Sequence, residues 1–285
     1  MPSATNYSNL LDANRGVLAE TCEIMSRTKM EYVVVGGWVP YLRGAGHTLH
    51  HPGTSDVDLL FNGDFDGVRN AIPEFFKAGY VPSAKHPFQL LKELTVGGKN
   101  FVFNVDLMYP AEAGSHEDLF HDIIDLGVRR DGYSLETHKM KSIAFLSADV
   151  IFYQSLWSDW LVSATTPDGR HVENTIPLMD ERGLILSKCE SVKGIKRGRD
   201  AFDIYFVLSG PNGSQTADGL KRLANQQPGA KTHLERLRAF VATEAELFDE
   251  RVAKYAGDAP VESSAGLVLR MIPDFGAPIS VERAG

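Results

Sequence analysis

The chain has 285 residues, of which 43% are hydrophobic and 23% are charged, and its formal net charge at pH 7 is -8. This length and composition are typical of a globular protein with a substantial core in one or two domains. The negative charge argues against a surface that binds nucleic acid as a whole, so any such contact needs a local basic patch.

The cysteines, the N-terminus and the apolar runs bear on the compartment. Cys22 and Cys189 lie in no Cys-x-x-Cys pair or Cys/His cluster, so we expect reduced thiols and no zinc site. The first residues lack the charged start and apolar run of a signal peptide. The most apolar later stretch contains Asp149 and Asp159, which argues against a membrane span. These features predict a cytoplasmic protein without a membrane partner.

The first 110 residues alternate helix and strand signals. Apolar residues at helical spacing indicate helices, and short apolar runs that end in glycine or turn residues indicate strands. The expected elements are a helix over 10–25, a strand over 32–37, a short helix over 38–46, a loop over 47–54, a strand over 55–61, a helix over 65–80 and a hairpin over 88–96 and 101–109. This order is typical of an α/β or α+β layer structure. We expect the three loop histidines to be exposed: His47, His50 and His51.

The rest of the chain has a mixed middle and a helical end. Residues 115–176 combine strand and helix signals that do not divide clearly. From residue 178 onward we expect helices over 178–195, 199–210 and 233–255, with a surface connection over 211–219. We therefore predict an α+β protein with a domain boundary between residues 132 and 179.

Two aspartates interrupt the otherwise apolar strand SDVDLLF. Strand side chains alternate between faces, so Asp56 and Asp58 point one way, and Val57 and Leu59 the other. Two like charges on one face of a buried strand repel and need compensation, unless that face is simply exposed. A third acid, Asp106, lies in the equally apolar run FVFNVDLMY. If the two strands pair, three carboxylates converge, and such oxygen ligands suit hard divalent cations such as magnesium.

A glycine pair precedes the first short helix. Gly36 and Gly37 end one strand, and glycines there let backbone N–H groups approach a phosphate closely, next to a helix N-terminus that favours negative charge. Alone, the pair fits a tight strand-to-helix turn equally well. Combined with the short helix, the loop, the Asp-x-Asp strand and the third acid, it is a much more specific sign of a phosphate site.

These residues resemble a known superfamily. GGWVPYLRGAGHTLHHPGTSDVDLLF is similar to the first motif of the DNA polymerase beta-like nucleotidyltransferases, in which Gly-Ser or Gly-Gly opens a helix and an Asp-x-Asp strand follows. The third acid of that superfamily matches Asp106. The Gly-Gly pair and the TSDVDLLF ending most resemble the AbiEii-type branch, known mainly as toxins of bacterial toxin–antitoxin and phage-defence systems.

The downstream half resembles the same branch, which carries a lysine on one helix and an Arg/Lys-Asp pair with a further aspartate on the next. LILSKCESVKGIKRGRDAFDIYFVL supplies Lys188, Arg199-Asp200 and Asp203. The resemblance implies that Lys188 contacts the phosphates of a nucleotide, and that Asp200 orients the lysine or assists the chemistry. The alternatives are an exposed helix lysine and a solvated basic turn.

The resemblance also implies an architecture and a reaction. The architecture is a polymerase beta-like core, a mixed sheet flanked by helices, over 1–132, an uncertain α/β connection over 133–178, and a helical C-terminal domain over 179–285 that contributes to the site. The reaction is transfer of NMP from an NTP to an acceptor hydroxyl, with release of pyrophosphate. Two magnesium ions, or manganese, would be held by Asp56, Asp58 and Asp106, and the nucleotide would be bound by Gly36, Gly37 and Lys188.

The acceptor is less constrained. The densest basic cluster consists of Lys193, Lys196, Arg197 and Arg199, which could grip an RNA backbone or contact the triphosphate. By resemblance tRNA is the leading acceptor, and a cognate antitoxin is a possible partner. Two alternatives stay open: a small cationic acceptor such as an aminoglycoside, and a non-catalytic nucleotide-binding or interaction protein that retains the fold.

Overall fold

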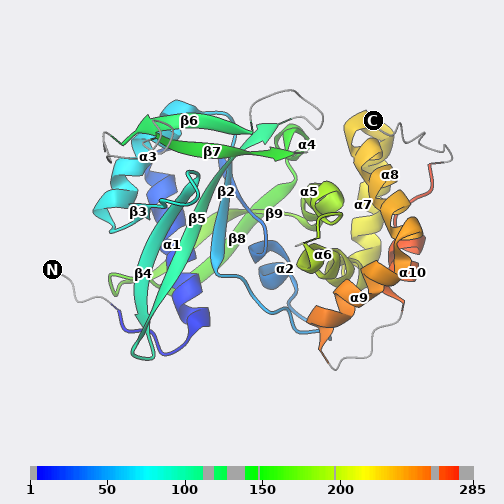
Figure 1. Ribbon diagram of the computed structural model, residues 1–285, viewed down its shortest axis with the longest axis horizontal. Coiled ribbons are helices and arrows are strands. Elements are labelled where there is room, and N and C mark those ends of the chain that lie inside the picture. The colour runs from blue at the N-terminus through cyan, green and yellow to red at the C-terminus, as the bar shows by residue number, and fades with distance from the viewer. Residues whose placement is uncertain are drawn as a thin grey trace. The chain divides into compact units, whose positions relative to one another are not determined.

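The structure is a computed structural model that describes residues 5–111, 119–126, 139–146, 148–195, 197–257 and 263–275. The protein is α+β, as the sequence predicts, with an open mixed sheet and a helical C-terminal part (Figure 1). It divides into two compact units. The sheet unit comprises Met1–Val39 and Gly53–Asp180, and the helical unit comprises Pro40–Pro52 and Glu181–Gly285.

The sheet unit is built on nine strands within the described residues. They are β1 (Tyr32–Val35), β2 (Asp56–Phe61), β3 (Val81–Pro82), β4 (Gln89–Val96), β5 (Lys99–Ala111), β6 (Phe120–Asp125), β7 (Lys139–Leu146), β8 (Trp157–Thr165) and β9 (His171–Met179). Seven follow the order β3-β4-β5-β2-β1-β9-β8, while β7 pairs with the end of β5, and β6 with β7. The pairs β2–β5, β1–β9 and β5–β7 are parallel, and the others are antiparallel. A short helix, α4 (Asp149–Tyr153), precedes β8.

Helices α1 (Leu10–Arg27) and α3 (Phe65–Lys77) cover one face of the central strands (Figure 1). Phe65 of α3 packs against Tyr109 of β5, with ring centroids 5.7 Å apart, and stacks on His121 of β6, with centroids 3.7 Å apart. The buried side chains of β2 and β5 on this face are Val57, Leu59, Phe61, Phe103, Val105, Leu107 and Tyr109. Because strand side chains alternate, the residues between them point to the opposite face, which we call the acid face.

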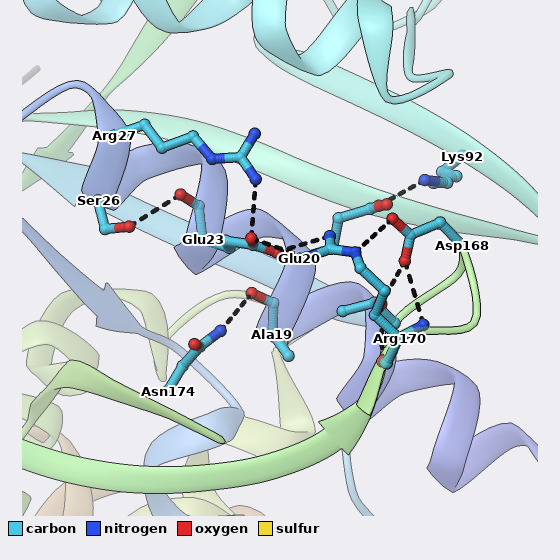
Figure 2. A network of polar contacts seen from close by, with 10 residues as sticks. Ala19, Glu20, Glu23, Ser26, Arg27, Lys92, Asp168, Arg170 and Asn174 are labelled. Carbon is cyan, nitrogen blue, oxygen red and sulfur yellow. Dashed lines mark hydrogen bonds and ion pairs between the residues drawn. The ribbon is translucent and has the colours of Figure 1, made fainter. Parts of the chain in front are cut away.

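Polar contacts tie α1 to strands of the sheet unit (Figure 2). Glu20 of α1 and Lys92 of β4 form a buried ion pair. At the start of β9, Arg170 donates two hydrogen bonds of 2.9 Å to Glu23 and one of 2.7 Å to Asp168. The Glu20–Lys92 pair is the costlier contact to disturb, because both of its members are removed from water whereas Arg170 is half exposed.

Replacing Lys92 by methionine is expected to lower the free energy of unfolding by about 3 kcal/mol at pH 7. Burial raises the pKa of Glu20 and Lys92 is the main group opposing that rise, so the variant leaves a buried carboxyl without its cation. A raised pKa favours the protonated folded state, so stability is lost as pH rises through it, and the deficit at pH 5 should be smaller than at pH 7. Denaturant unfolding at both pH values measures this.

The double variant Glu20→Gln/Lys92→Met is the control, because it removes both charges. It should recover most of the stability lost in Lys92→Met. A single variant as stable as the wild type would show that the pair contributes nothing net.

The helical unit contains α5 (Glu181–Ser191), α6 (Gly198–Ser209), α7 (Gly213–Gln226), α8 (Pro228–Thr243), α9 (Ala245–Ala256) and α10 (Ser264–Met271). Helix α6 is central, since it packs on α5, α7, α9 and α10, and its residues from Asp200 to Leu208 are all buried. No helix in the described part of the chain is long and apolar enough to cross a lipid bilayer.

Three expected elements are wrong in the C-terminal half. The helix expected over 178–195 starts only at Glu181, because the two residues before Asp180 end β9. The surface connection expected over 211–219 instead contains the first half of α7, whose small and apolar residues are buried at helical spacing. The helix expected over 233–255 is two helices, α8 and α9, broken at Glu244 (φ -118°, ψ 40°). Glutamate favours helix, so packing rather than propensity turns the chain there.

The middle region also takes shape. Within the described residues, the stretch expected as a connection over 133–178 supplies β7, α4, β8 and most of β9. Residues 112–118 and 127–138, part of the mixed region, lie outside the described residues.

Candidate functional site

The glycine pair forms the turn between β1 and α2 (Trp38–Arg43). Gly36 has φ +71°, a left-handed conformation that side chains rarely adopt, and a Cβ there would overlap the carboxylate of Asp58. The pairing of Val35 with Asp58 brings the two segments together. Helix α2 has only six residues, so the expected contribution of a helix N-terminus at Gly37 is small.

The three carboxylates share the acid face, because the two strands that carry them pair. Strands β2 and β5 pair in parallel, with Asp58 opposite Asp106 and Asp56 opposite Asn104. All three aspartates are partly buried. The side-chain amide of Asn104 donates a hydrogen bond to Asp56 Oδ1, and that of Gln89 donates one to Asp106 Oδ2. Each hydrogen bond is 3.3 Å long. Neutral donors therefore offset part of the charge that the strand pair concentrates here.

The types of these residues, and their place on one side of the strand pair, suit a divalent cation. Hard cations such as magnesium take carboxylate oxygens, and two facing aspartates with a third two residues away supply them. Among the described residues, no group of three or more His, Cys, Asp or Glu side chains is placed so that it could hold a metal ion. The carboxylate ligands are thus present on one face, but their side chains do not form a metal-binding geometry.

Substituting Gly36 by alanine should destabilise the sheet unit, and it should remove the magnesium-dependent nucleotide binding that the resemblance implies. Alanine costs about 1–2 kcal/mol in the left-handed region, and its Cβ must also displace the Asp58 carboxylate. Gly63→Ala is a matched control, because Gly63 has φ +69° with nothing within 4 Å of its Cβ position. Thermal unfolding and calorimetric NTP titration compare the two. Equal stability losses with nucleotide binding intact in both would contradict the role of Gly36.

A second polar cluster lies in the helical unit, around Lys188 of α5. The buried Lys188 Nζ is 2.5 Å from Asp200 Oδ1 and 2.8 Å from Asp203 Oδ2, both on α6. His51 Nε2 lies 3.0 Å from Asp203 Oδ1, and Arg199 Nε lies 3.8 Å from the same oxygen. Asp203 therefore joins three side chains inside the unit.

The cluster is balanced in charge. Burial lowers the pKa of Lys188, but Asp203 and Asp200 outweigh it and leave the pKa raised. Burial raises the pKa of Asp203, but Lys188 and then His51 hold it at about 2. Burial lowers the pKa of His51 against the pull of Asp203, so the ring is neutral at pH 7. Two cations, Lys188 and Arg199, thus face two carboxylates.

This balance bears on the role expected for Lys188. Asp200 contacts the lysine ammonium, and Asp203 contacts the same ammonium. A phosphate would have to compete with two buried carboxylates for it. Lys188 and Asp200 belong to the helical unit, and the three acids of the acid face belong to the sheet unit.

The predicted basic cluster has fewer available charges than its sequence suggests. Lys193 is exposed but pairs with Glu190 at 2.8 Å, and Arg199 is drawn toward Asp203. Arg197 is exposed just before α6, and Lys196 lies outside the described residues. Within the part of the chain that the structure describes, this turn is therefore a weak candidate for gripping RNA.

The expectation that the loop histidines are exposed is wrong for two of them. His47 stacks on Phe206, with ring centroids 4.1 Å apart, and its Nε2 is 2.9 Å from the Phe206 carbonyl oxygen. His51 is buried against Asp203, and only His50 is exposed. The available signal was Asp203 itself, because an acid in so apolar a helix requires a partner.

No protein-family model matches the sequence, and no curated protein is significantly similar to it. A function for the chain therefore has to come from its own residues and their geometry.

Proposed function

We propose that the chain is a metal-dependent nucleotidyltransferase of the DNA polymerase beta-like kind, similar to the AbiEii-type branch. Its sheet unit would be the catalytic core, and its acceptor would be an RNA hydroxyl, with tRNA as the leading candidate. The observation that carries the proposal is the register of β2 with β5, in which Asp58 faces Asp106 and Asp56 shares their face. The Gly36 turn against Asp58 supports it.

The proposed reaction forms one phosphorus–oxygen bond and breaks another. The acceptor oxygen forms a bond to the α-phosphorus, the bond from that phosphorus to the bridging oxygen breaks, and pyrophosphate leaves with the electron pair. The hydroxyl proton is released to water. The negative charge of Asp106 would favour this release, and the backbone N–H groups of Gly36 and Gly37 would contact the β- and γ-phosphates.

Asp56, Asp58 and Asp106 would hold two magnesium ions, or manganese. When bound, the ions would neutralise charge on the triphosphate and on the attacking and leaving oxygens. Without a cation, two facing carboxylates repel, which is a reason for their site to select one. The charge-balanced cluster favours Lys188 as a group that holds α5 to α6, with any phosphate contact secondary.

A role as a toxin-like or phage-defence protein with a cognate antitoxin follows from the resemblance alone. Such a protein would arrest growth when it is overproduced, and the arrest would require Asp56 and Asp58.

A label-transfer assay tests the proposal. The purified protein is incubated with magnesium, each α-labelled NTP in turn and total tRNA, with Asp56→Ala and a chelator as controls. Label on tRNA that both controls abolish establishes donor, acceptor and class together. Transfer to an aminoglycoside instead would reassign the acceptor. Absence of both transfer and magnesium-dependent NTP binding would replace the proposal with a non-catalytic role.

A further inference from the structure

A pocket of about 230 Å³ opens in the sheet unit beside the start of β4. Its walls come from the loop before β4, from residues in and just after β6, and from β7. Three of its lining residues are lysines, Lys85, Lys139 and Lys141, and none of the described lining residues is acidic. In a chain of net charge -8, the described lining of this pocket is therefore basic, unlike the chain as a whole.

Two of the lysines share a face with the catalytic candidates. Ile143 of β7 pairs with Met108 of β5, and register partners point to the same side of a sheet. Met108 lies two residues from Asp106, and Lys141 two residues before Ile143, so both belong to the acid face. Lys139, two residues earlier again, follows the same side.

The loop that carries Lys85 is held in place. The Ser83 hydroxyl oxygen accepts hydrogen bonds from the backbone N–H groups of Lys85 and His86, at 3.3 and 3.1 Å. Further along, the Lys141 N–H donates to the Pro87 carbonyl over 2.8 Å. The next residue but one is Gln89, whose amide donates to Asp106. The pocket wall is thus continuous with the surroundings of Asp106.

Aromatic rings flank the lysines. Phe88 and Phe120 stack, with centroids 6.0 Å apart and planes 16° apart, and His86 lies 5.8 Å from Phe88. All three rings are partly exposed. Ammonium groups that follow a phosphate backbone beside rings on which bases stack are the usual elements of a single-strand site.

Carboxylates near the lysines are the competing partners. Asp122 pairs with Lys139 at 2.5 Å and with Lys141 at 3.5 Å, and Asp125 lies opposite Lys139 in the strand pair. The Lys139–Asp122 pair is about half exposed, and such pairs contribute little to stability. The Lys139 ammonium can therefore turn from Asp122 to a phosphate at low cost, whereas Lys141, with 19% of its side chain exposed, is held more firmly. Lys85, the third lining lysine, is exposed.

We propose that this pocket binds single-stranded RNA, with the lysines on its phosphates and Phe88 and Phe120 against its bases. Its volume is below the roughly 300–1,000 Å³ of pockets that enclose a whole ligand, which suits one segment of a strand that continues outside. That the bound strand is the acceptor rests on the proposed function, whereas binding itself does not. The acceptor site thereby moves from the turn before α6 to the acid face of the sheet unit.

Fluorescence anisotropy with a labelled RNA of about 12 nucleotides tests the proposal, without magnesium or NTP. The pocket variant is Lys85→Gln/Lys139→Gln/Lys141→Gln. The control variant, Lys29→Gln/Lys77→Gln/Lys99→Gln, removes three exposed lysines of the same unit that lie outside the pocket lining. The pocket variant should lose affinity at least about tenfold, and the slope of log affinity against log salt should fall by about 0.7 for each engaged lysine. The control should keep most of both.

Phe120→Leu provides the aromatic arm. This variant should weaken the binding of single-stranded RNA about fivefold or more. The affinity for pyrophosphate, measured by its displacement of the labelled RNA, should stay unchanged. Equal losses in both lysine variants, duplex RNA bound as tightly as single strands, or pyrophosphate bound without RNA would each overturn the proposal. Because the assay contains no NTP, the absence of both transfer and magnesium-dependent NTP binding, with intact pocket binding, would overturn the transferase proposal and leave this one standing.

Discussion

Asp58→Asn is expected to lower the proposed magnesium-dependent nucleotidyl transfer by about a thousandfold or more, with no loss of thermal stability. Asp58 is the carboxylate that touches Gly36 and faces Asp106. Asparagine has the same shape, so the contact with Gly36 is kept while the charge that would hold a cation is lost. Removing one of two facing charges also relieves repulsion, so the melting temperature should stay level or rise slightly.

Asp159→Asn is the matched control for Asp58→Asn, because Asp159 is an exposed strand aspartate of the same sheet. It should leave turnover unchanged. Label transfer and thermal unfolding are measured for both proteins. Full turnover in Asp58→Asn, or a variant that fails to fold, would argue against the acid face as a metal site.

Lys188→Met should destabilise the helical unit by about 4–5 kcal/mol at pH 7, the largest stability effect we expect in the chain. Methionine fills a similar volume but leaves Asp200 and Asp203 buried without their shared cation. The effect exceeds that of Lys92→Met because two carboxylates rather than one are left behind. Denaturant unfolding, followed by a signal from the helical unit, measures it.

The pH dependence separates charge loss from packing loss. In the wild type the pKa of Asp203 is depressed to about 2, so its contribution is present above the unfolded pKa and is lost as pH falls toward 2. Lys188→Met removes the largest of the contributions that depress this pKa, so the difference between the proteins should shrink as pH is lowered. Lys193→Met, which breaks an exposed pair with Glu190, should cost less than about 1 kcal/mol at any pH. A pH-independent loss would mean that packing, not charge, dominates.

The acid face could be anticipated from the sequence because its signal is local. Alternation along an apolar strand puts Asp56 and Asp58 on one side, and an acid in a second apolar strand suggests a neighbour. The register that sets Asp58 against Asp106 needed the folded sheet, since 48 residues with a helix and a hairpin separate them. Helix α6 was also predicted nearly to its ends, because Gly210-Pro211 stops it and apolar residues fill it.

What escaped prediction depends on contacts far apart in the chain. His51 meets Asp203 across 152 residues, and nothing near His51 indicates burial. The lysine pocket joins a loop before β4 to strands that follow more than 30 residues later. Helix α7 was missed because its sequence is rich in Gly, Ser, Thr and Asp, which locally favour turns, and only packing of its small residues makes it a helix.

The two units alternate along the sequence. The segment Pro40–Pro52 belongs to the helical unit, yet it is spliced between Gly36 and Asp58 of the sheet unit. The backbone crosses from one unit to the other three times, after Val39, Pro52 and Asp180. No single cut or gene fusion can exchange one unit for a foreign counterpart without removing the anchors His47 and His51 or breaking the glycine-to-aspartate motif. Recombination at a single point therefore cannot transfer either unit intact.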